Sequence, residues 1–170
     1  GSNGQSAELS RILIQFPVTQ ISADRTAGII PAAGSVSFFL KMYNAEHPFT
    51  LPQDFTLTVA PIARAWSEGT GLDMDEYKDL GVSNWLRSDA STSWTVVGGD
   101  YLRDDNNDVV FPRGYEDLEV DVTDVVENWI LGSAGGQYDN YGFGIRLTGS
   151  QEAYFSSSAG SGVLGPGANS

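Results

Sequence analysis

Apolar residues alternate with polar ones along much of this chain, and this two-residue period limits the possible folds more than any other feature. Successive side chains of a β-strand point to opposite faces, so alternation predicts strands with one covered face. Gly, Pro and Asn residues separate the alternating runs. This pattern predicts an all-β fold, which we interpret as a jelly-roll-like β-sandwich with one or two short helices. The expected strands are residues 11–16, 36–43, 55–59, 94–97, 118–122, 141–147 and 153–156.

The alternation also assigns side chains to faces. Glu119 and Asp121 in one strand, and Thr56 and Thr58 in another, are expected to point into solvent. Two glycines in residues 141–147 leave one face of that strand bare. Another segment of the chain is therefore expected to approach closely there.

Two short segments have a helical pattern instead. In residues 124–131, Asp124 and Glu127 have the spacing of a capping box, and apolar residues recur four positions apart on one face. This helix is expected to close one end of the sandwich. The second segment, residues 73–80, is about two turns long and needs packing to persist.

The chain of 170 residues has the length of a single domain. We interpret residues 1–10 as an N-terminal extension or the scar of a tag, and residues 11–158 as the β-sandwich domain. Residues 159–170 are expected to form a flexible Gly/Ser-rich tail.

The net charge of −13 argues against several kinds of partner. Such a surface repels phosphate groups, so we expect no nucleic-acid partner, and it disfavours anionic membranes. No stretch approaches the roughly 18 apolar residues that a membrane helix needs. Calcium binding or a salty environment is compatible with this acidity, but a solvated acidic surface explains it more simply.

Few side chains suit catalysis. The chain has no cysteine and one histidine, His47, which precedes Pro48 in an expected turn. Cys-His dyads, thiolate zinc sites and histidine-rich metal sites are therefore excluded. A carboxylate pair such as Glu119 and Asp121, roughly 7 Å apart along a strand, is the remaining option. Because alternation alone produces such pairs, we expect a protein that is not an enzyme.

A short acidic loop is the candidate metal site. Asp104, Asn106 and Asp108 follow the first three alternating oxygen positions of a calcium-binding loop. The EF-hand pattern then fails, since Val109 stands at the glycine position and Tyr115 at the glutamate position. Calcium is thus the one cofactor considered, against the simpler interpretation of an exposed acidic turn.

The four tryptophans divide into two groups. Trp129 lies on the apolar face of its expected helix and Trp66 follows a strand, so both are expected in the core. Trp85 and Trp94 lie in less regular sequence and are the candidates for ligand binding, since exposed indoles stack on sugar rings. Burial in the core is the alternative for these two residues as well.

Six segments, in order, carry a resemblance to a known family. They are Arg11-Ile-Leu-Ile-Gln-Phe16, Gly34-Ser-Val-Ser-Phe-Phe-Leu-Lys41, Ala65-Trp-Ser-Glu-Gly-Thr70, Leu118-Glu-Val-Asp-Val-Thr-Asp-Val-Val-Glu-Asn-Trp129, Asn140-Tyr-Gly-Phe-Gly-Ile145 and Tyr154-Phe-Ser-Ser-Ser158. Their order resembles the DNRLRE-type domain, a β-sandwich module related to a carbohydrate-binding family. This resemblance implies a structural or binding role and no catalytic residues.

Residues 71–79 and 83–85 resemble a subset of these sequences, the virion structural proteins of tailed phages, notably marine ones. In those relatives the chain continues into one further β-rich segment. The resemblance therefore implies that the present chain is a fragment, or a processed product, without its last strand.

The leading hypothesis is a non-enzymatic structural or assembly protein of a virion, in the capsid, neck, tail or fibre. Its expected partners are other virion proteins or copies of itself, bound through a contact patch or an open sheet edge. The alternative hypothesis is a carbohydrate-binding module of a secreted or surface protein, with a glycan as its ligand. A polysaccharide-cleaving enzyme is the third and weakest hypothesis.

Overall fold

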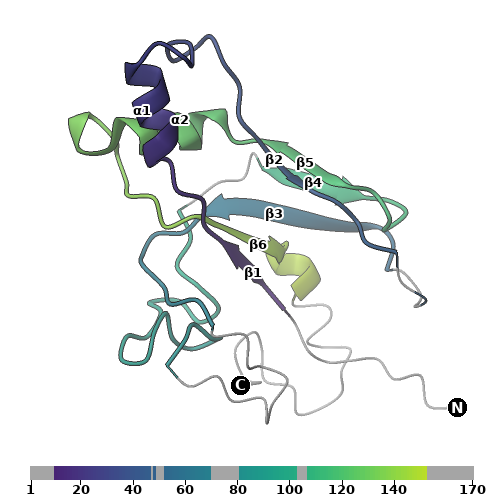
Figure 1. Cartoon of the computed structure of the whole chain (residues 1–170). Coiled ribbons are helices and arrows are strands. Elements are labelled where there is room, and N and C mark those ends of the chain that lie inside the picture. The colour runs from purple at the N-terminus through teal and green to yellow at the C-terminus, as the bar shows by residue number, and fades with distance from the viewer. Residues whose placement is uncertain (1–9, 47, 49–51, 70–80, 103–106, 153–170) are drawn as a thin grey trace, which may run out of the picture.

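The computed structural model describes residues 10–46, 48, 52–69, 81–102 and 107–152. These residues form antiparallel strands joined by loops and a few short helices, which is consistent with the all-β prediction (Figure 1). In chain order the elements are β1 (Ile12–Ile14), α1 (Thr19–Thr26), β2 (Phe39–Met42), β3 (Phe55–Pro61), β4 (Asp108–Phe111), β5 (Leu118–Asp121), α2 (Thr123–Leu131), the 3-10 turn η1 (Gly132–Ala134) and β6 (Phe143–Leu147).

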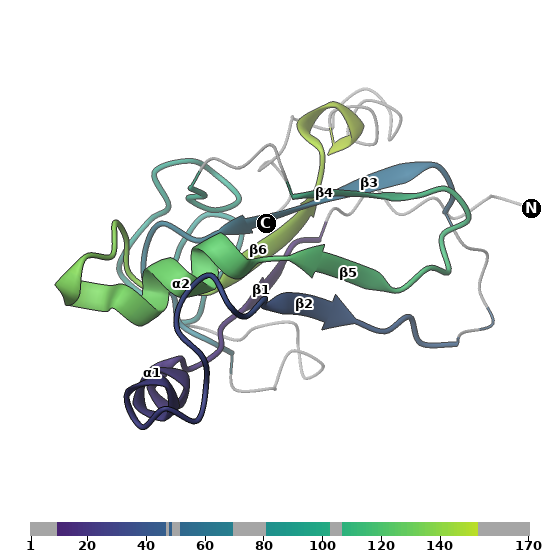
Figure 2. The ribbon, with the colours of Figure 1, turned by 90° about the horizontal axis from the view of Figure 1, so that it is seen from above.

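The strands form two sheets. One has the order β1-β6-β3-β4, and the other pairs β2 with β5. In the larger sheet, Val59 of β3 lies opposite Ile145 of β6, and Leu57 of β3 lies opposite Val109 of β4. β1 is therefore an edge strand, and β2 has one edge without a partner strand among the described residues. Figures 1 and 2 show these two edges on the same side of the protein.

The core lies between the sheets and α2. The helix turns its apolar face inward, as the spacing of its residues predicts, and the ring of Trp129 packs 4.8 Å from that of Phe143 in β6. Trp129 is thus confirmed as a core residue. The buried cluster consists of Leu40, Val59, Phe111, Leu118, Val120, Val122, Val125, Val126, Trp129, Phe143 and Ile145.

The capping box predicted for α2 is wrong. The helix begins at Thr123, so Asp124 lies inside its first turn, and Val122 at the N-cap makes no side-chain capping bond. Asp121 serves the helix start instead, because its carboxylate accepts a hydrogen bond from the backbone N–H of Thr123 at 2.8 Å. Glu127 pairs with Arg25 of α1.

Three further expectations differ from the structure. Thr58, expected in solvent, is only 5% exposed: it lies in a strand flanked by β4 and β6, and its hydroxyl donates to Asp108 at 2.6 Å. Residues 94–97 form a loop rather than a strand, since the N–H groups of Thr95 and Val96 bond to the carboxylate of Asp100. Helix α1 was not expected; none of its residues is buried, so no apolar period marks it. The segments 73–80 and 153–156 lie outside the described residues.

The close approach expected at the glycines of residues 141–147 is confirmed. A Cβ on Gly144 would overlap the ring of Tyr101 and would lie 2.8 Å from Ile62. Gly142 has a φ of 82°, and a Cβ there would overlap the backbone of Ile14. These contacts bring the segment before residue 102 against β6, which positions the candidate site.

Gly144→Ala tests this contact. The added methyl group should force Tyr101 away from β6 and lower the free energy of unfolding by about 1–3 kcal/mol, the usual cost of overpacking. Gly149→Ala is the matched control, because no atom lies within 4 Å of the position that a Cβ would take there. Urea denaturation of both variants measures the difference, and equal stabilities would contradict the packing described.

Candidate binding site

Residues 81–102 form an irregular segment held by side-chain to backbone hydrogen bonds. The side-chain oxygen of Asn84 accepts bonds from the N–H groups of Leu86 and Arg87, each at 2.9 Å. Asp89 accepts bonds from the N–H groups of Ser91 and Thr92, which lower its pKa to about 2. Asn and Asp favour such turns, so the segment keeps its shape without a strand ladder.

Asp100 fixes the end of this segment. Its carboxylate accepts the N–H groups of Thr95 and Val96 at 3.0 and 2.8 Å and pairs with Arg64 at 3.2 Å. Burial alone would raise the pKa of Asp100, but these bonds and the charge of Arg64 hold it below its ordinary value. The carboxylate is therefore charged at neutral pH and is part of the structure.

An ion pair ties the segment to the sheet. Nε and Nη2 of Arg11 donate to the two carboxylate oxygens of Glu152 at 2.9 and 2.6 Å, and Nη1 donates to the carbonyl of Gly98 at 2.5 Å. The guanidinium also lies 4.6 Å from the ring centre of Trp85 and 5.6 Å from that of Tyr101. Burial would lower the pKa of Arg11, but the hydrogen bond and charge of Glu152 raise it above its ordinary value.

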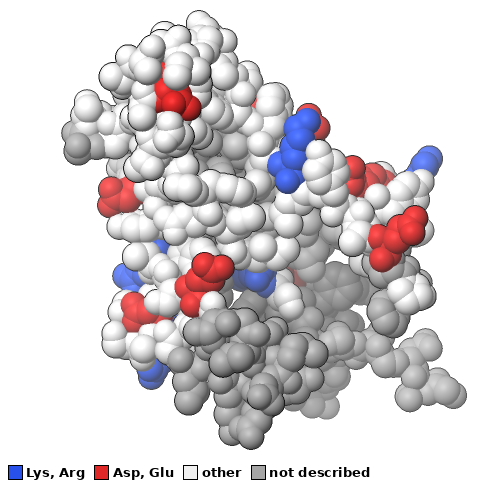
Figure 3. Space-filling model, in the orientation of Figure 1, with Lys and Arg blue, Asp and Glu red and all other residues white. Residues whose placement is uncertain are grey.

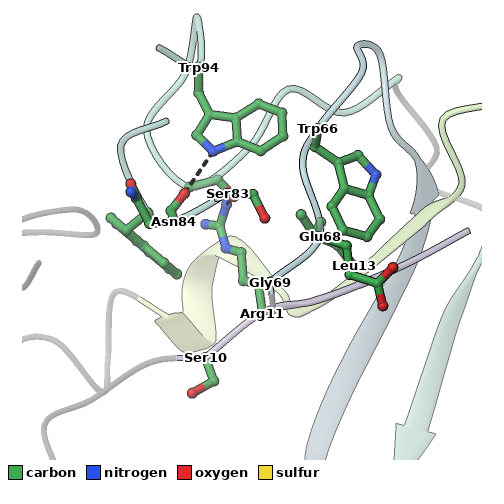
Figure 4. Close-up of a pocket in the computed structure, with 11 residues that line it drawn as sticks. Ser10, Arg11, Leu13, Trp66, Glu68, Gly69, Ser83, Asn84 and Trp94 are labelled. Atoms are coloured by element: carbon green, nitrogen blue, oxygen red, sulfur yellow. Dashed lines mark hydrogen bonds between the residues drawn. The ribbon is translucent and has the colours of Figure 1, made fainter. Parts of the chain in front are cut away.

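A pocket of about 400 Å³ opens beside this ion pair (Figure 4). Three of the four tryptophans line it, together with polar side chains. The lining residues are Ser10, Arg11, Leu13, Trp66, Glu68, Gly69, Ser83, Asn84, Trp85, Trp94 and Gly98. Both its size and its mixture of aromatic and polar groups are typical of small-ligand sites.

The tryptophan rings are fixed to different degrees. Nε1 of Trp66 donates to the carbonyl of Tyr141, and Nε1 of Trp94 donates to that of Asn84, each at 2.8 Å. Trp94 is only 6% exposed. Trp85 is half-buried; its Nε1 is buried and has no hydrogen-bond partner among the described residues. Trp66, expected in the core, is also half-buried and lines the pocket.

The structure thus brings Trp85 and Trp94 together, and their role in ligand binding stays a prediction. Sequence reasoning did not connect Arg11, Glu68 or Glu152 with them. Glu68 belongs to the Trp-Ser-Glu-Gly motif, which is the one signal that could have indicated it.

The other predicted site residues lie elsewhere. Asp108 begins β4, while Asp104 and Asn106 lie outside the described residues, as does His47, so the calcium site stays a prediction. Within the described ranges, no group of three or more acidic or histidine side chains is placed to hold a metal ion. Glu119 and Asp121 are exposed on β5, and Glu119 pairs with Lys41 at 2.8 Å.

A second hollow, of about 530 Å³, lies on the side of the protein where β1 and β2 have their free edges. Its walls come from the residues between β1 and α1, from α1 itself, from β2 and the residue before it, from α2 and the residue before it, and from the start of β6. They are Phe16, Pro17, Val18, Ile21, Phe38, Phe39, Leu40, Lys41, Val122, Val126, Trp129 and Phe143. In Figure 3 the surface between α1 and β2 is almost entirely uncharged. We call this hollow the apolar groove.

Comparison with protein-family models, with curated proteins and with solved structures finds no match. The resemblance to the DNRLRE-type domain therefore stays a prediction. No helix of the described part of the chain is long and apolar enough to cross a membrane.

Glu152→Gln should destabilise the protein strongly. It leaves the largely buried guanidinium of Arg11 without a counter-charge, which costs about 3–5 kcal/mol of the free energy of unfolding. Glu119→Gln removes an exposed, solvent-screened ion pair and should lower the stability far less. Chemical denaturation compares the two, and a Glu152→Gln variant as stable as the control would refute the role given to this pair.

Asp100→Asn should give a pH-dependent loss of stability. Since the folded-state pKa of Asp100 is lowered, its contribution is present above the ordinary value of 3.8 and disappears as the pH falls through the lowered value. The variant should be less stable than the parent by about 1–3 kcal/mol at pH 7. In thermal unfolding from pH 7 to pH 2, the difference in stability between the parent and the variant should narrow only below the ordinary pKa. A difference that stays constant over this range would argue against a charged carboxylate.

Proposed function

We propose that this chain is a non-enzymatic structural or assembly protein of a virion, built on a jelly-roll-like β-sandwich. The resemblance of residues 71–79 and 83–85 to virion structural proteins of tailed phages supports this assignment. The observation in the structure that favours it most is the edge of β2 that has no partner strand among the described residues and lies beside the apolar groove. An assembly protein needs such a surface, whereas a monomeric protein usually protects a free edge.

The backbone of β2 has groups that can pair with another strand. The carbonyl of Phe38 accepts the N–H of Val122 at 2.9 Å, so Phe38 turns its backbone groups toward β5. Residues of an antiparallel strand alternate between bonding their partner strand and pointing away from it. Phe39 and Lys41 therefore present their N–H and C=O groups at the free edge.

The occupant that fits this edge is an extended, apolar segment of a neighbouring subunit. Among the described residues that line the groove Lys41 alone is charged, and Glu119 already neutralises it. A partner therefore gains from apolar side chains, which enter the groove, and from main-chain hydrogen bonds along β2. This is the chemistry of strand addition.

Lys41→Pro tests the proposal. Proline removes the outward N–H of residue 41 and leaves the bonds between β2 and β5 intact, which edge positions tolerate. Mass spectrometry of purified particles should detect the parent chain and at least about tenfold less of the proline variant, equivalent to roughly 1.4 kcal/mol of lost binding.

Lys41→Gln is the matched control, because it loses the same ion pair with Glu119 but keeps the N–H. It should enter particles like the parent. Circular dichroism confirms that all three chains are folded. Absence of the parent from particles would refute the virion assignment, and equal incorporation of all variants would refute the role of the β2 edge.

The tryptophan-lined pocket favours a second candidate function, a carbohydrate-binding module. Sugar recognition combines flat aromatic faces with groups that bond hydroxyls, and the pocket contains both. The two functions are compatible in one protein, because the pocket and the apolar groove share no lining residue.

A further inference from the structure

We propose that the tryptophan-lined pocket selects uncharged sugars, with Trp66 as the stacking platform and Glu68 as the acceptor of sugar hydroxyls. This inference rests on the second candidate function, glycan binding at the same pocket. It assigns the ligand class and the residues that determine it.

The single cation among the described lining residues, Arg11, is paired within the protein. All three nitrogens of Arg11 are bonded, two to the carboxylate of Glu152 and one to the carbonyl of Gly98. The charge of Glu152 cancels that of the guanidinium, and the ring of Trp85 covers one of its faces. A carboxylate or sulfate group of an anionic sugar would therefore find no cation among these residues to pair with.

The remaining charge in the pocket is negative. Glu68 is exposed and makes no ion pair or hydrogen bond within the described part of the chain. In Figure 4 its carboxylate lies at the edge of the pocket, below Trp66. An ionised carboxylate accepts hydrogen bonds only, so it suits hydroxyl donors and repels anions. The net charge of −13 adds to this repulsion.

Two uncharged polar side chains that line the same pocket also suit hydroxyls. The side-chain oxygen of Asn84 accepts two backbone N–H groups, and its NH₂ group, which bonds to no described residue, can donate. Ser83 adds a hydroxyl that can donate or accept. Uncharged donors and acceptors beside one carboxylate match a ring with several hydroxyl groups.

Two of the three tryptophans that line the pocket are less suited to stacking than the third. Trp94 is 6% exposed and forms a wall of the pocket, with little free face. One face of Trp85 lies against the guanidinium of Arg11. Trp66 is half-buried, and its Nε1 bond to the carbonyl of Tyr141 holds the ring in place, so it is the tryptophan best placed to take the apolar face of a sugar.

Affinity electrophoresis of the full chain, with chelator present, tests the inference. Hydroxyethyl cellulose and carboxymethyl cellulose share a backbone and differ in charge, and neutral mannan, xylan and galactan with anionic alginate extend the comparison to other sugars. At least one neutral polymer should retard the protein about tenfold more strongly than any anionic one at low salt.

Two variants and a control separate the contributions of the Trp66 ring and the Glu68 charge to polymer binding. Trp66→Ala should weaken binding of the neutral polymer by about tenfold or more. Glu68→Gln, which keeps the shape and removes the charge, should weaken neutral binding and reduce the discrimination against anionic polymers. Tyr43→Ala removes an exposed aromatic ring that does not line the pocket, and should change nothing.

The outcomes distinguish the inference from the function on which it rests. Stronger binding of an anionic polymer would overturn the inference and leave glycan binding intact. Unchanged binding by Trp66→Ala would overturn the assignment of the platform. Binding of no polymer at all would overturn the glycan-binding function and the inference together.

Discussion

The ion pair between Arg11 and Glu152 is the interaction on which the rest of the site depends. It joins residues 141 positions apart, and both side chains are largely buried. A buried guanidinium requires a counter-charge and hydrogen-bond acceptors, and Glu152 and the carbonyl of Gly98 together accept three hydrogen bonds from Arg11. Stacking on Trp85 adds a contact with the segment 81–102, so one cation connects the first strand, the irregular segment and the end of the described chain.

The same ion pair sets the chemistry of the pocket. Because the positive charge is used internally, the surface left to a ligand consists of indole faces, neutral polar groups and one carboxylate. Asp100 supports this arrangement from the other end of the segment by accepting two backbone N–H groups. Arg11 therefore anchors the segment and, through its pairing with Glu152, leaves no unpaired cation among the described residues that line the pocket.

The second constraint is the unequal size of the two sheets. Four strands lie in one sheet and two in the other within the described residues. β1 and β2 each have a free edge among these residues, and the two edges lie on the same side of the protein. Helices α1 and α2, joined by the pair of Arg25 with Glu127, cover part of that side. The remaining surface is the apolar groove, where core residues such as Trp129 and Phe143 line a hollow that no described segment fills.

The sequence by itself determined strands β1, β2, β3, β5 and β6, the apolar face of α2 and the close approach at Gly144, because each follows from local periodicity or from a missing side chain. Only the tertiary structure decided which strands pair and what covers Thr58, since β4 carries too few alternating residues to reveal itself. It also decided that Arg11, Trp66 and Trp85 meet. Ion pairs and stacking between distant residues leave no periodic trace along a chain, so the pocket could be recognised only after the chain had folded.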